Sequence, residues 1–198
     1  MSPRPDVSEE RVRQILEAAG AVFARSGFSD TRMDDIATAA GLSKGALYLY
    51  FPGKEGIIMA LLRHTFDREL EGIEAALGGE GTVVERLVEY VRTQCRETAH
   101  LRDLLPVTFE FYATALRNGE LRSFFHEYFA RSTGLLSRLL QQGIDRGELR
   151  PHDTHAVATL LTAQFEGLAL LWLLDPDAID RASVHEQGLR ATFEGLKA

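Results

Sequence analysis

Apolar residues recur at intervals of three and four along almost the whole of this 198-residue chain. Val12, Ile15, Leu16 and Ala19 show the pattern first, and residues at these spacings share one face of an α-helix. Glycine and proline interrupt the pattern, most clearly in Gly78-Gly79-Glu80-Gly81. No segment alternates convincingly with the period of two that a half-buried strand requires. The sequence therefore predicts an all-α fold.

These interruptions divide the chain into helices of very unequal length. Two short ones are expected after Gly27, the first starting with the capping-box-like Thr31-Arg32-Met33-Asp34 and the second capped by Ser43. Helices of about eight residues are too short to be stable alone, so both must pack against the first helix. Longer helices are expected over Lys54 to Leu77, Thr82 to Thr98, Leu101 to Leu116, Leu121 to Arg146, His155 to Leu174 and Ser183 to Leu196. We therefore predict an N-terminal three-helix domain (residues 1–53) joined by a long helix to a C-terminal helical domain (residues 54–198).

The net charge of −7 is unevenly distributed between these domains. Residues 1–54 carry seven basic and seven acidic side chains, whereas the remainder carries 15 basic and 22 acidic ones. A neutral N-terminal domain can present a basic face locally, so the acidity does not exclude a nucleic-acid partner. The single cysteine, Cys95, fits a reducing cytoplasm, and the longest apolar run, Leu160 to Leu174, is interrupted by Gln164 and Glu166. We expect a cytoplasmic protein that does not engage a membrane.

The segment from Ile36 to Ser43 has the residue types of a helix-turn-helix. Its small residues allow two helices to cross closely, and Gly41 permits the tight turn between them. On the following helix Lys44 and Tyr48 are four residues apart, so they share the face opposite Leu47 and flank a glycine. A helix of this length spans ~12 Å, about the width of the DNA major groove. The alternative is an ordinary helical core in which the tyrosine is buried.

Three stretches of sequence carry a family resemblance: Val22-Phe23-Ala24-Arg25-Ser26-Gly27-Phe28, Thr31-Arg32-Met33-Asp34-Asp35-Ile36-Ala37, and Ala40-Gly41-Leu42-Ser43-Lys44-Gly45-Ala46-Leu47-Tyr48-Leu49-Tyr50-Phe51-Pro52-Gly53-Lys54-Glu55. Over about its first 60 residues the chain resembles the N-terminal domain of the TetR/AcrR family of regulators. The remaining two-thirds is similar to that family in helix order and length. The resemblance implies a homodimer that binds an operator in double-stranded DNA and senses a small-molecule effector.

The resemblance also implies DNA-binding roles for individual residues. Thr31 and Arg32, at the start of the second helix, would hold a phosphate. Ser43, Lys44, Gly45 and Tyr48 would face bases or adjacent phosphates, and Leu49, Tyr50 and Lys54 would lie against the DNA backbone. Asp34 stands where some members of the family have a basic residue, which leaves it the role of a helix cap.

The helix expected over His155 to Leu174 is apolar nearly all round, which indicates burial on more than one side. Together with the helix over Ser183 to Leu196, it could form the four-helix interface between subunits that is typical of the family. The alternative is a central core helix without any role in dimerisation.

Aromatic residues distributed over three helices favour an apolar effector cavity in the C-terminal domain. The candidate ligand-binding residues are Cys95, Phe109, Tyr112, Phe124, Tyr128, Phe165 and Trp172. For each aromatic a filled core is the alternative. Gln94, Glu110, Gln164 and Glu166 are polar groups within apolar runs, and each either orients a ligand head group, turns outward or pairs across the dimer.

The chain contains no phosphate-binding glycine loop, nucleophile elbow or His-Glu-x-x-His motif, so an enzyme is not expected. His152 and His155 have no evident third partner, so neither a metal nor a cofactor is expected. We predict a ligand-responsive transcriptional regulator that acts as a repressor. It is expected to bind a palindromic operator as a homodimer and to be released from it by a small hydrophobic effector. Activation is also compatible with the residues. The competing class is a helical small-molecule-binding protein, which would show no salt-dependent binding to duplex DNA.

Overall fold

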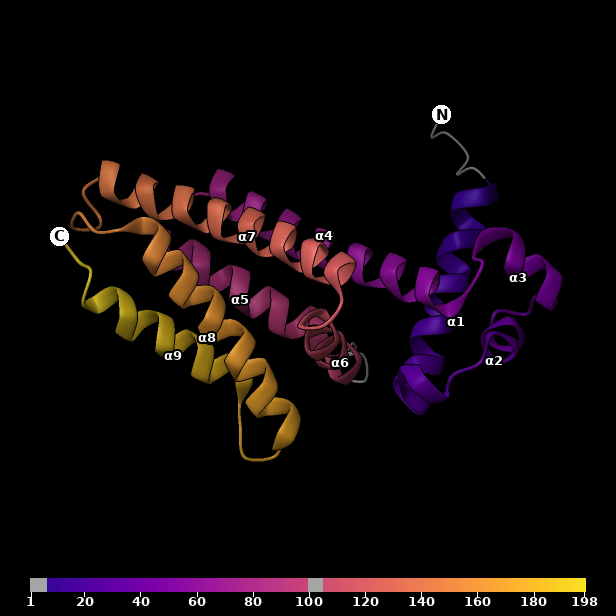
Figure 1. The fold of residues 1–198 in the computed structure, drawn as a ribbon. Coiled ribbons are helices and arrows are strands. Elements are labelled where there is room, and N and C mark those ends of the chain that lie inside the picture. Colours follow the sequence, from indigo (N-terminus) through magenta and orange to yellow (C-terminus); the bar gives the residue numbers. More distant parts are fainter. Residues whose placement is uncertain (1–6, 100–104) are drawn as a thin grey trace. The chain divides into compact units, whose positions relative to one another are not determined.

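The structure, a computed structural model, describes residues 7–99 and 105–198. Within these ranges its regular elements are α-helices, as the sequence predicts (Figure 1). They are α1 (Val7–Asp30), α2 (Met33–Ala39), α3 (Lys44–Tyr50), α4 (Lys54–Gly78), α5 (Val83–Ala99), α6 (Leu105–Ala115), α7 (Gly119–Asp145), α8 (Thr154–Leu174) and α9 (Arg181–Glu194). Residues 101–104 of the helix predicted over Leu101 to Leu116 lie outside the described ranges.

The described residues form two compact units. The N-terminal unit comprises residues 7–66 and 105–110, and the C-terminal unit comprises residues 67–99 and 111–198. Both α4 and α6 contribute residues to each unit.

The core of the N-terminal unit joins the two short helices to α1. α1 packs on α2, and α2 packs on α3. Ile15 and Phe23 of α1, Ile36 of α2 and Leu47 of α3 are completely buried. Complete burial of one such side chain contributes ~1.5–3 kcal/mol, which compensates for the poor intrinsic stability of seven-residue helices.

Two glycines with positive φ shape the turns of this unit. Gly27 has φ 70° and interrupts α1, as its position in the sequence predicts, and Gly41 has φ 65° in the turn between α2 and α3. Residues with a Cβ rarely adopt this backbone conformation, so the turns depend on glycine.

The start of α2 differs from the sequence prediction by one residue. Arg32 is the N-cap, and its backbone N–H donates to Asp35 Oδ2 at 3.0 Å. The Thr31 hydroxyl instead donates to the Gly27 carbonyl at 2.7 Å and closes the preceding turn. The predicted capping pair of Thr31 and Asp34 is therefore wrong, because the Thr31 hydroxyl bonds to the Gly27 carbonyl and not to the first turn of α2.

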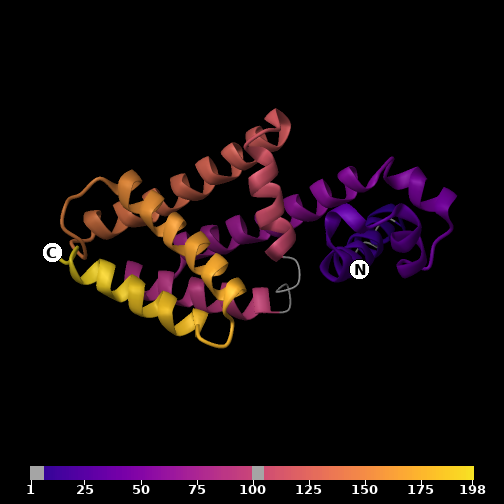
Figure 2. The same ribbon diagram turned by 60° about the horizontal axis from the view of Figure 1, so that its bottom comes forward.

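In the C-terminal unit, α7 packs along α8 and α5 packs along α9, and the views in Figures 1 and 2 agree on this arrangement. Leu139 and Leu140 of α7 and Ala158 of α8 are fully buried between these helices. Asp180 accepts a hydrogen bond from the Ser183 N–H at 3.1 Å, so α9 starts at Arg181, two residues earlier than predicted.

α8 buries one side and leaves an apolar stripe on the other. Leu160, Leu171 and Leu174 are 58%, 54% and 74% exposed. Ala163 and Gly167 are exposed between them, and the intervals of three and four place all five residues on one face. By length and composition alone, α8 is the helix in the described ranges that could also cross a membrane. α8 therefore has a second apolar face that the other described residues do not cover.

Candidate functional site

α3 exposes the face opposite its buried anchor. The Ser43 hydroxyl accepts a hydrogen bond from the first turn at 3.2 Å, and Leu47 holds the helix against the core. On the outer side Tyr48 and Leu49 are 44% and 85% exposed. A Cβ added at Gly45 would meet nothing within 4 Å, so the backbone there is open to the surface. Adjacent exposed apolar side chains beside open backbone suit a surface that a partner covers.

Lys44 at the start of α3 forms an ion pair with Asp34 of α2. Its Nζ lies 2.8 Å from Oδ1 and 3.1 Å from Oδ2 of the carboxylate. The hydrogen bond to Asp34 raises the pKa of the Lys44 ammonium, and the carboxylate charge adds to the effect. Both side chains are more than half exposed, so the pair is weak and the lysine can exchange this partner for a phosphate. Asp34 therefore orients a lysine and does not cap α2.

The other predicted DNA-binding residues have different surroundings. Arg32 is exposed and Tyr50 is partly exposed. Thr31 is buried at 2% exposure, and its hydroxyl proton is already donated to a carbonyl. Lys54 Nζ donates to the carbonyls of Phe28, Ser29 and Thr31 at 2.7, 2.9 and 3.1 Å, which engages all three ammonium protons. In this conformation Thr31 and Lys54 brace the start of α2, while Ser43, Lys44, Gly45, Tyr48 and Leu49 form the exposed surface of α3.

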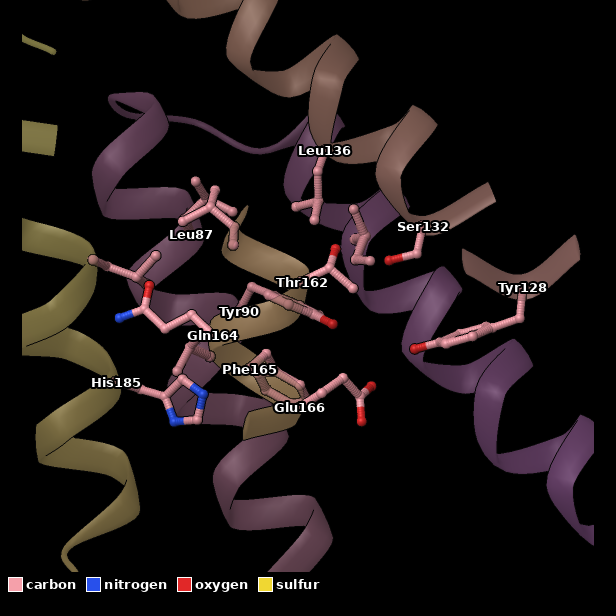
Figure 3. Close-up of a pocket in the computed structure, with 14 residues that line it drawn as sticks. Leu87, Tyr90, Tyr128, Ser132, Leu136, Thr162, Gln164, Phe165, Glu166 and His185 are labelled. Carbon is pink, nitrogen blue, oxygen red and sulfur yellow. The ribbon is translucent and has the colours of Figure 1, made fainter. Parts of the chain in front are cut away.

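A second candidate site is a cavity inside the C-terminal unit (Figure 3). Its volume is about 40 Å³, which holds a few water molecules. Apolar side chains from α4, α5, α7, α8 and α9 form most of its wall. The polar groups on the wall include Tyr90, Tyr128, Gln164, Glu166 and His185.

Two carboxylates, Glu69 of α4 and Glu166 of α8, lie in and beside this cavity. The Tyr128 hydroxyl donates to Glu69 at 2.5 Å, and the Tyr112 hydroxyl donates to Glu166 at 3.2 Å. Burial raises the pKa of both carboxyls, and the charge of Glu69 helps to bring the pKa of Glu166 to about 8. Among the ion pairs of the described residues, none includes either carboxylate. Glu166 therefore keeps its proton at neutral pH.

His185 of α9 presents an unsatisfied acceptor to the same cavity. It is buried at 3% exposure, and its Nδ1 lies 3.0 Å from the Arg181 carbonyl. A carbonyl only accepts, so Nδ1 carries the proton and Nε2 carries a lone pair. Burial lowers the pKa of His185 to about 4, so the ring is neutral at pH 7. In the described residues Nε2 has no hydrogen-bond partner.

Arg181 brings one positive charge close to this group. Its guanidinium carbon lies 5.2 Å from the centre of the Phe165 ring and 5.6 Å from that of Trp172. The charge lowers the pKa of Glu69 and Glu166, but by less than burial raises them. Two carboxyl groups thus share the field of one guanidinium.

The predicted ligand-binding residues are distributed unevenly around this cavity. Tyr128 and Phe165 line it, and Tyr112 reaches it through the hydrogen bond to Glu166. Its wall does not include Cys95, Phe109, Phe124 or Trp172. Phe124 packs on Phe125, Trp172 flanks Arg181, and Phe109 belongs to the N-terminal unit. Burial raises the pKa of the Cys95 thiol, which makes it less reactive.

Sequence reasoning missed three polar groups of this site: Glu69, Tyr90 and His185. Glu166 was recognisable as an acid inside an apolar run, and Tyr90 continues the periodic face of its helix beside Val91. Glu69 lies among charged neighbours along α4, so no signal in the sequence separates it from solvated acids.

Comparisons with known proteins match both units. The family model for bacterial regulatory proteins of the tetR family matches residues 15–61, which include α2 and α3. The model for the C-terminal domain of BetI-type transcriptional repressors matches residues 83–195. This second match covers more than half of the chain.

Individual relatives agree with these matches. The uncharacterised HTH-type transcriptional regulator YfiR of Bacillus subtilis strain 168 is 34% identical over 154 residues, which cover 76% of this chain and 75% of YfiR. The fatty acid metabolism regulator protein of the same strain is 25% identical over 186 residues, covering 92% of this chain and 94% of that protein. A transcriptional regulator from Saccharomonospora viridis, solved in complex with choline, has a TM-score of 0.81 at 27% identity and covers 94% of this chain and 96% of its own. The chain therefore belongs to the TetR family of bacterial transcriptional regulators.

Proposed function

We propose that this protein is a cytoplasmic, ligand-responsive repressor that binds a palindromic operator as a homodimer and releases it when a small molecule occupies the C-terminal cavity. The observation that carries the proposal is the exposed surface of α3, which has a buried anchor on one side and Lys44, open backbone, Tyr48 and Leu49 on the other.

This surface has the chemistry that DNA recognition requires. Lys44 supplies a cation that can exchange Asp34 for a phosphate or a guanine edge. Tyr48 offers a hydroxyl, and Leu49 offers an apolar surface suited to a thymine methyl or a sugar. Gly45 allows the helix backbone to approach the groove closely.

The uncovered stripe of α8 supports a dimer. Leu160, Leu171 and Leu174 flank the small residues Ala163 and Gly167, so a second helix can approach closely and bury the leucines. Exposed apolar stripes of this kind are typical of subunit interfaces. Two subunits related by a twofold axis would place their α3 helices on half-sites ~34–36 Å apart, one turn of DNA.

The cavity supports regulation by a ligand. One relative of known structure was solved in complex with choline, so a protein with a similar fold and sequence binds a small molecule. The present cavity holds only a few waters, so any such molecule must widen it. A ligand that favours the widened state shifts the protein toward it, and operator release follows if that state binds DNA more weakly.

The test is fluorescence anisotropy with labelled duplexes of random and palindromic sequence, titrated with the full chain at several salt concentrations. The wild type is expected to bind with an affinity that falls as salt rises. Lys44→Ala removes one cationic contact and is expected to lower the salt slope by about one and to weaken binding. Tyr48→Ala is expected to weaken binding without changing the slope.

Lys197→Ala is the matched control, since this exposed lysine pairs only locally with Glu194 in the C-terminal unit. If both α3 variants bound duplex DNA with the affinity of the wild type, these α3 side chains would not contact DNA. Absence of salt-dependent binding by the wild type would favour the competing class, a small-molecule-binding protein that does not use DNA.

A further inference from the structure

We propose that Asp34 of α2 is a specificity-determining residue of the DNA-binding surface, and that its carboxylate accepts a hydrogen bond from the amino group of a base in the major groove. The base pair that fits this contact best is G·C, with Lys44 on the guanine and Asp34 on the cytosine. This inference rests on the proposed function, in which α3 binds DNA, and it extends base recognition to a second helix.

The first argument is the position of the Asp34 carboxylate. α2 packs on α3 in the N-terminal unit (Figure 1), and the two carboxylate oxygens of Asp34 lie 2.8 and 3.1 Å from Lys44 Nζ. A DNA acceptor bonded to that ammonium would lie within ~6 Å of the carboxylate, since a second hydrogen bond adds ~3 Å. The Asp34 side chain is 61% exposed, so DNA that reaches the lysine can also reach the carboxylate.

The fold of α2 does not use this carboxylate. Asp35 accepts the capping hydrogen bond from the Arg32 N–H, and the Thr38 hydroxyl donates to the backbone carbonyl of Asp34. Within the described residues the Asp34 carboxylate bonds to Lys44 alone. It therefore becomes available to DNA when the lysine turns to a DNA acceptor.

The second argument is what DNA offers to such a carboxylate. Phosphates are negatively charged, and neither a phosphate nor a deoxyribose within the chain has a hydrogen-bond donor. In the major groove the donors are the amino groups of cytosine and adenine. A carboxylate that is desolvated at the interface without a donor costs binding free energy. Asp34 therefore penalises every DNA site that does not place an amino group beside it.

The third argument is the match between the ion pair and a G·C base pair. In the major groove guanine presents two acceptors, and the amino donor of the paired cytosine lies next to them. Lys44 and Asp34 present an ammonium and a carboxylate side by side, which is the complementary pattern. An A·T pair offers the ammonium one acceptor on adenine, and its amino group is followed by a thymine acceptor that repels a carboxylate. The two side chains together therefore favour G·C.

The same carboxylate is expected to lower the affinity for DNA in general. Its charge repels the phosphates of any sequence, so Lys44 without this neighbour would bind DNA more tightly and less selectively. Loss of a residue that only supports the lysine would instead weaken binding to every sequence. The affinity for a random duplex, and the ratio of affinities for selected and random duplexes, therefore separate the two roles.

The experiment selects bound duplexes from one random-sequence pool with the full chain as wild type, Asp34→Ala, Asp34→Asn and Glu17→Ala. The wild type is expected to enrich a G·C pair at one position of each half-site. Asp34→Ala is expected to accept all four base pairs there, and Asp34→Asn is expected to prefer adenine, which both donates to and accepts from an amide. Glu17→Ala removes the same charge from an exposed acid of α1 and is expected to retain the wild-type consensus.

Fluorescence anisotropy then measures the affinities of the same proteins. Asp34→Ala is expected to bind a random duplex about two- to fivefold more tightly than the wild type at low salt, with a gain that shrinks as salt rises. Its ratio of affinities for selected and random duplexes is expected to fall at least about fivefold.

A selected duplex that carries N4-methylcytosine at the G·C position tests the contact itself. This base still pairs with guanine, but a methyl group replaces the amino hydrogen that faces the groove. The modified duplex is expected to bind the wild type more weakly than the unmodified one and to bind Asp34→Ala equally well.

A wild-type consensus in Asp34→Ala, or equal effects of N4-methylcytosine on both proteins, would overturn the role of Asp34. Weaker binding of Asp34→Ala to random and selected duplexes alike would also overturn it, because a residue that only supports Lys44 gives that result. In each of these cases the wild type still selects DNA, so the repressor proposal stands. A wild type that selects no sequence would refute the repressor proposal and the role of Asp34 with it.

Discussion

Single side chains decide the chemistry of both sites, and the most informative are those with unexpected partners. Lys44 is held by Asp34, Lys54 by three carbonyls, and Glu69 and Glu166 by tyrosine hydroxyls. The DNA-binding candidates on α3, Lys44 and Tyr48, can be identified from the sequence because their spacing of four residues places them on one face of the helix. It does not identify Glu69, because the neighbours that make this acid unusual come from other helices.

The raised pKa of Glu166 predicts how stability depends on pH. Its folded-state pKa of about 8 lies above the ordinary value of 4.5, so the folded chain holds a proton that the unfolded chain has lost. Stability from this group is therefore greatest below pH 4.5 and falls as the pH rises to 8, by up to ~1.4 kcal/mol per pH unit. Urea denaturation at pH 5.5, 7 and 8.5 and at constant protein concentration measures this change in the free energy of unfolding. Glu166→Gln is expected to have a flatter profile than the wild type, and parallel profiles would refute the assignment.

Lys54 is predicted to contribute to the stability of the folded protein through its three hydrogen bonds to backbone carbonyls. Lys54→Met keeps the aliphatic stem but leaves the carbonyls of Phe28, Ser29 and Thr31 without their charged donor. Because hydrogen bonds to a charged group contribute more than neutral ones, we expect a loss of ~2–3 kcal/mol in thermal or urea unfolding. Lys197→Met, at an exposed pair with Glu194, is the control and should change stability little. Equal stability of the two variants would show that the three bonds are not formed in solution.

At the scale of elements, the order and approximate limits of the helices follow from the sequence. Gly27, Gly41 and Ser43 mark ends and starts because each acts through its own backbone or through the adjacent turn. The start of α2 was misplaced by one residue because Thr31 bonds to the preceding turn, a choice that depends on the packing of α1. Which face of α8 is covered was not predictable from its composition, since leucines lie on both faces.

Adding one methyl group to α3, at Gly45, is expected to change DNA binding without reducing the stability of the protein. Gly45→Ala has open space for its Cβ, and alanine favours the helical conformation over glycine because it loses less backbone entropy on folding. The variant is therefore expected to be as stable as the wild type or more so, yet to bind duplex DNA more weakly because the methyl group keeps the backbone away from the groove. Gly134→Ala in α7 also has open space and should raise stability without affecting DNA binding. Undiminished DNA affinity in Gly45→Ala would show that this backbone does not approach DNA.

At the scale of the whole molecule, recognition of a palindromic operator requires two subunits. Leu171→Glu places a charge in the exposed stripe of α8, where the proposed interface would have to bury it without a partner. Sedimentation velocity is expected to show a dimer for the wild type and a monomer for the variant, with weaker operator binding as a result. Leu116→Glu, at a leucine that is 75% exposed outside α8, should remain dimeric. A monomeric wild type, or a wild type that floats with lipid vesicles, would contradict the proposed use of this stripe.

We infer that a dimer of this chain binds specific DNA sequences through α3, and selection of bound duplexes from a random-sequence pool is the most direct test of this inference. We expect enrichment of a palindrome with half-sites about 10 base pairs apart, or a multiple of one turn, and one dimer or more per duplex. Selection with Lys44→Ala should relax the preference at particular positions in both half-sites. A pool that remains random after repeated selection, with no salt-dependent retention by the wild type, would contradict the account.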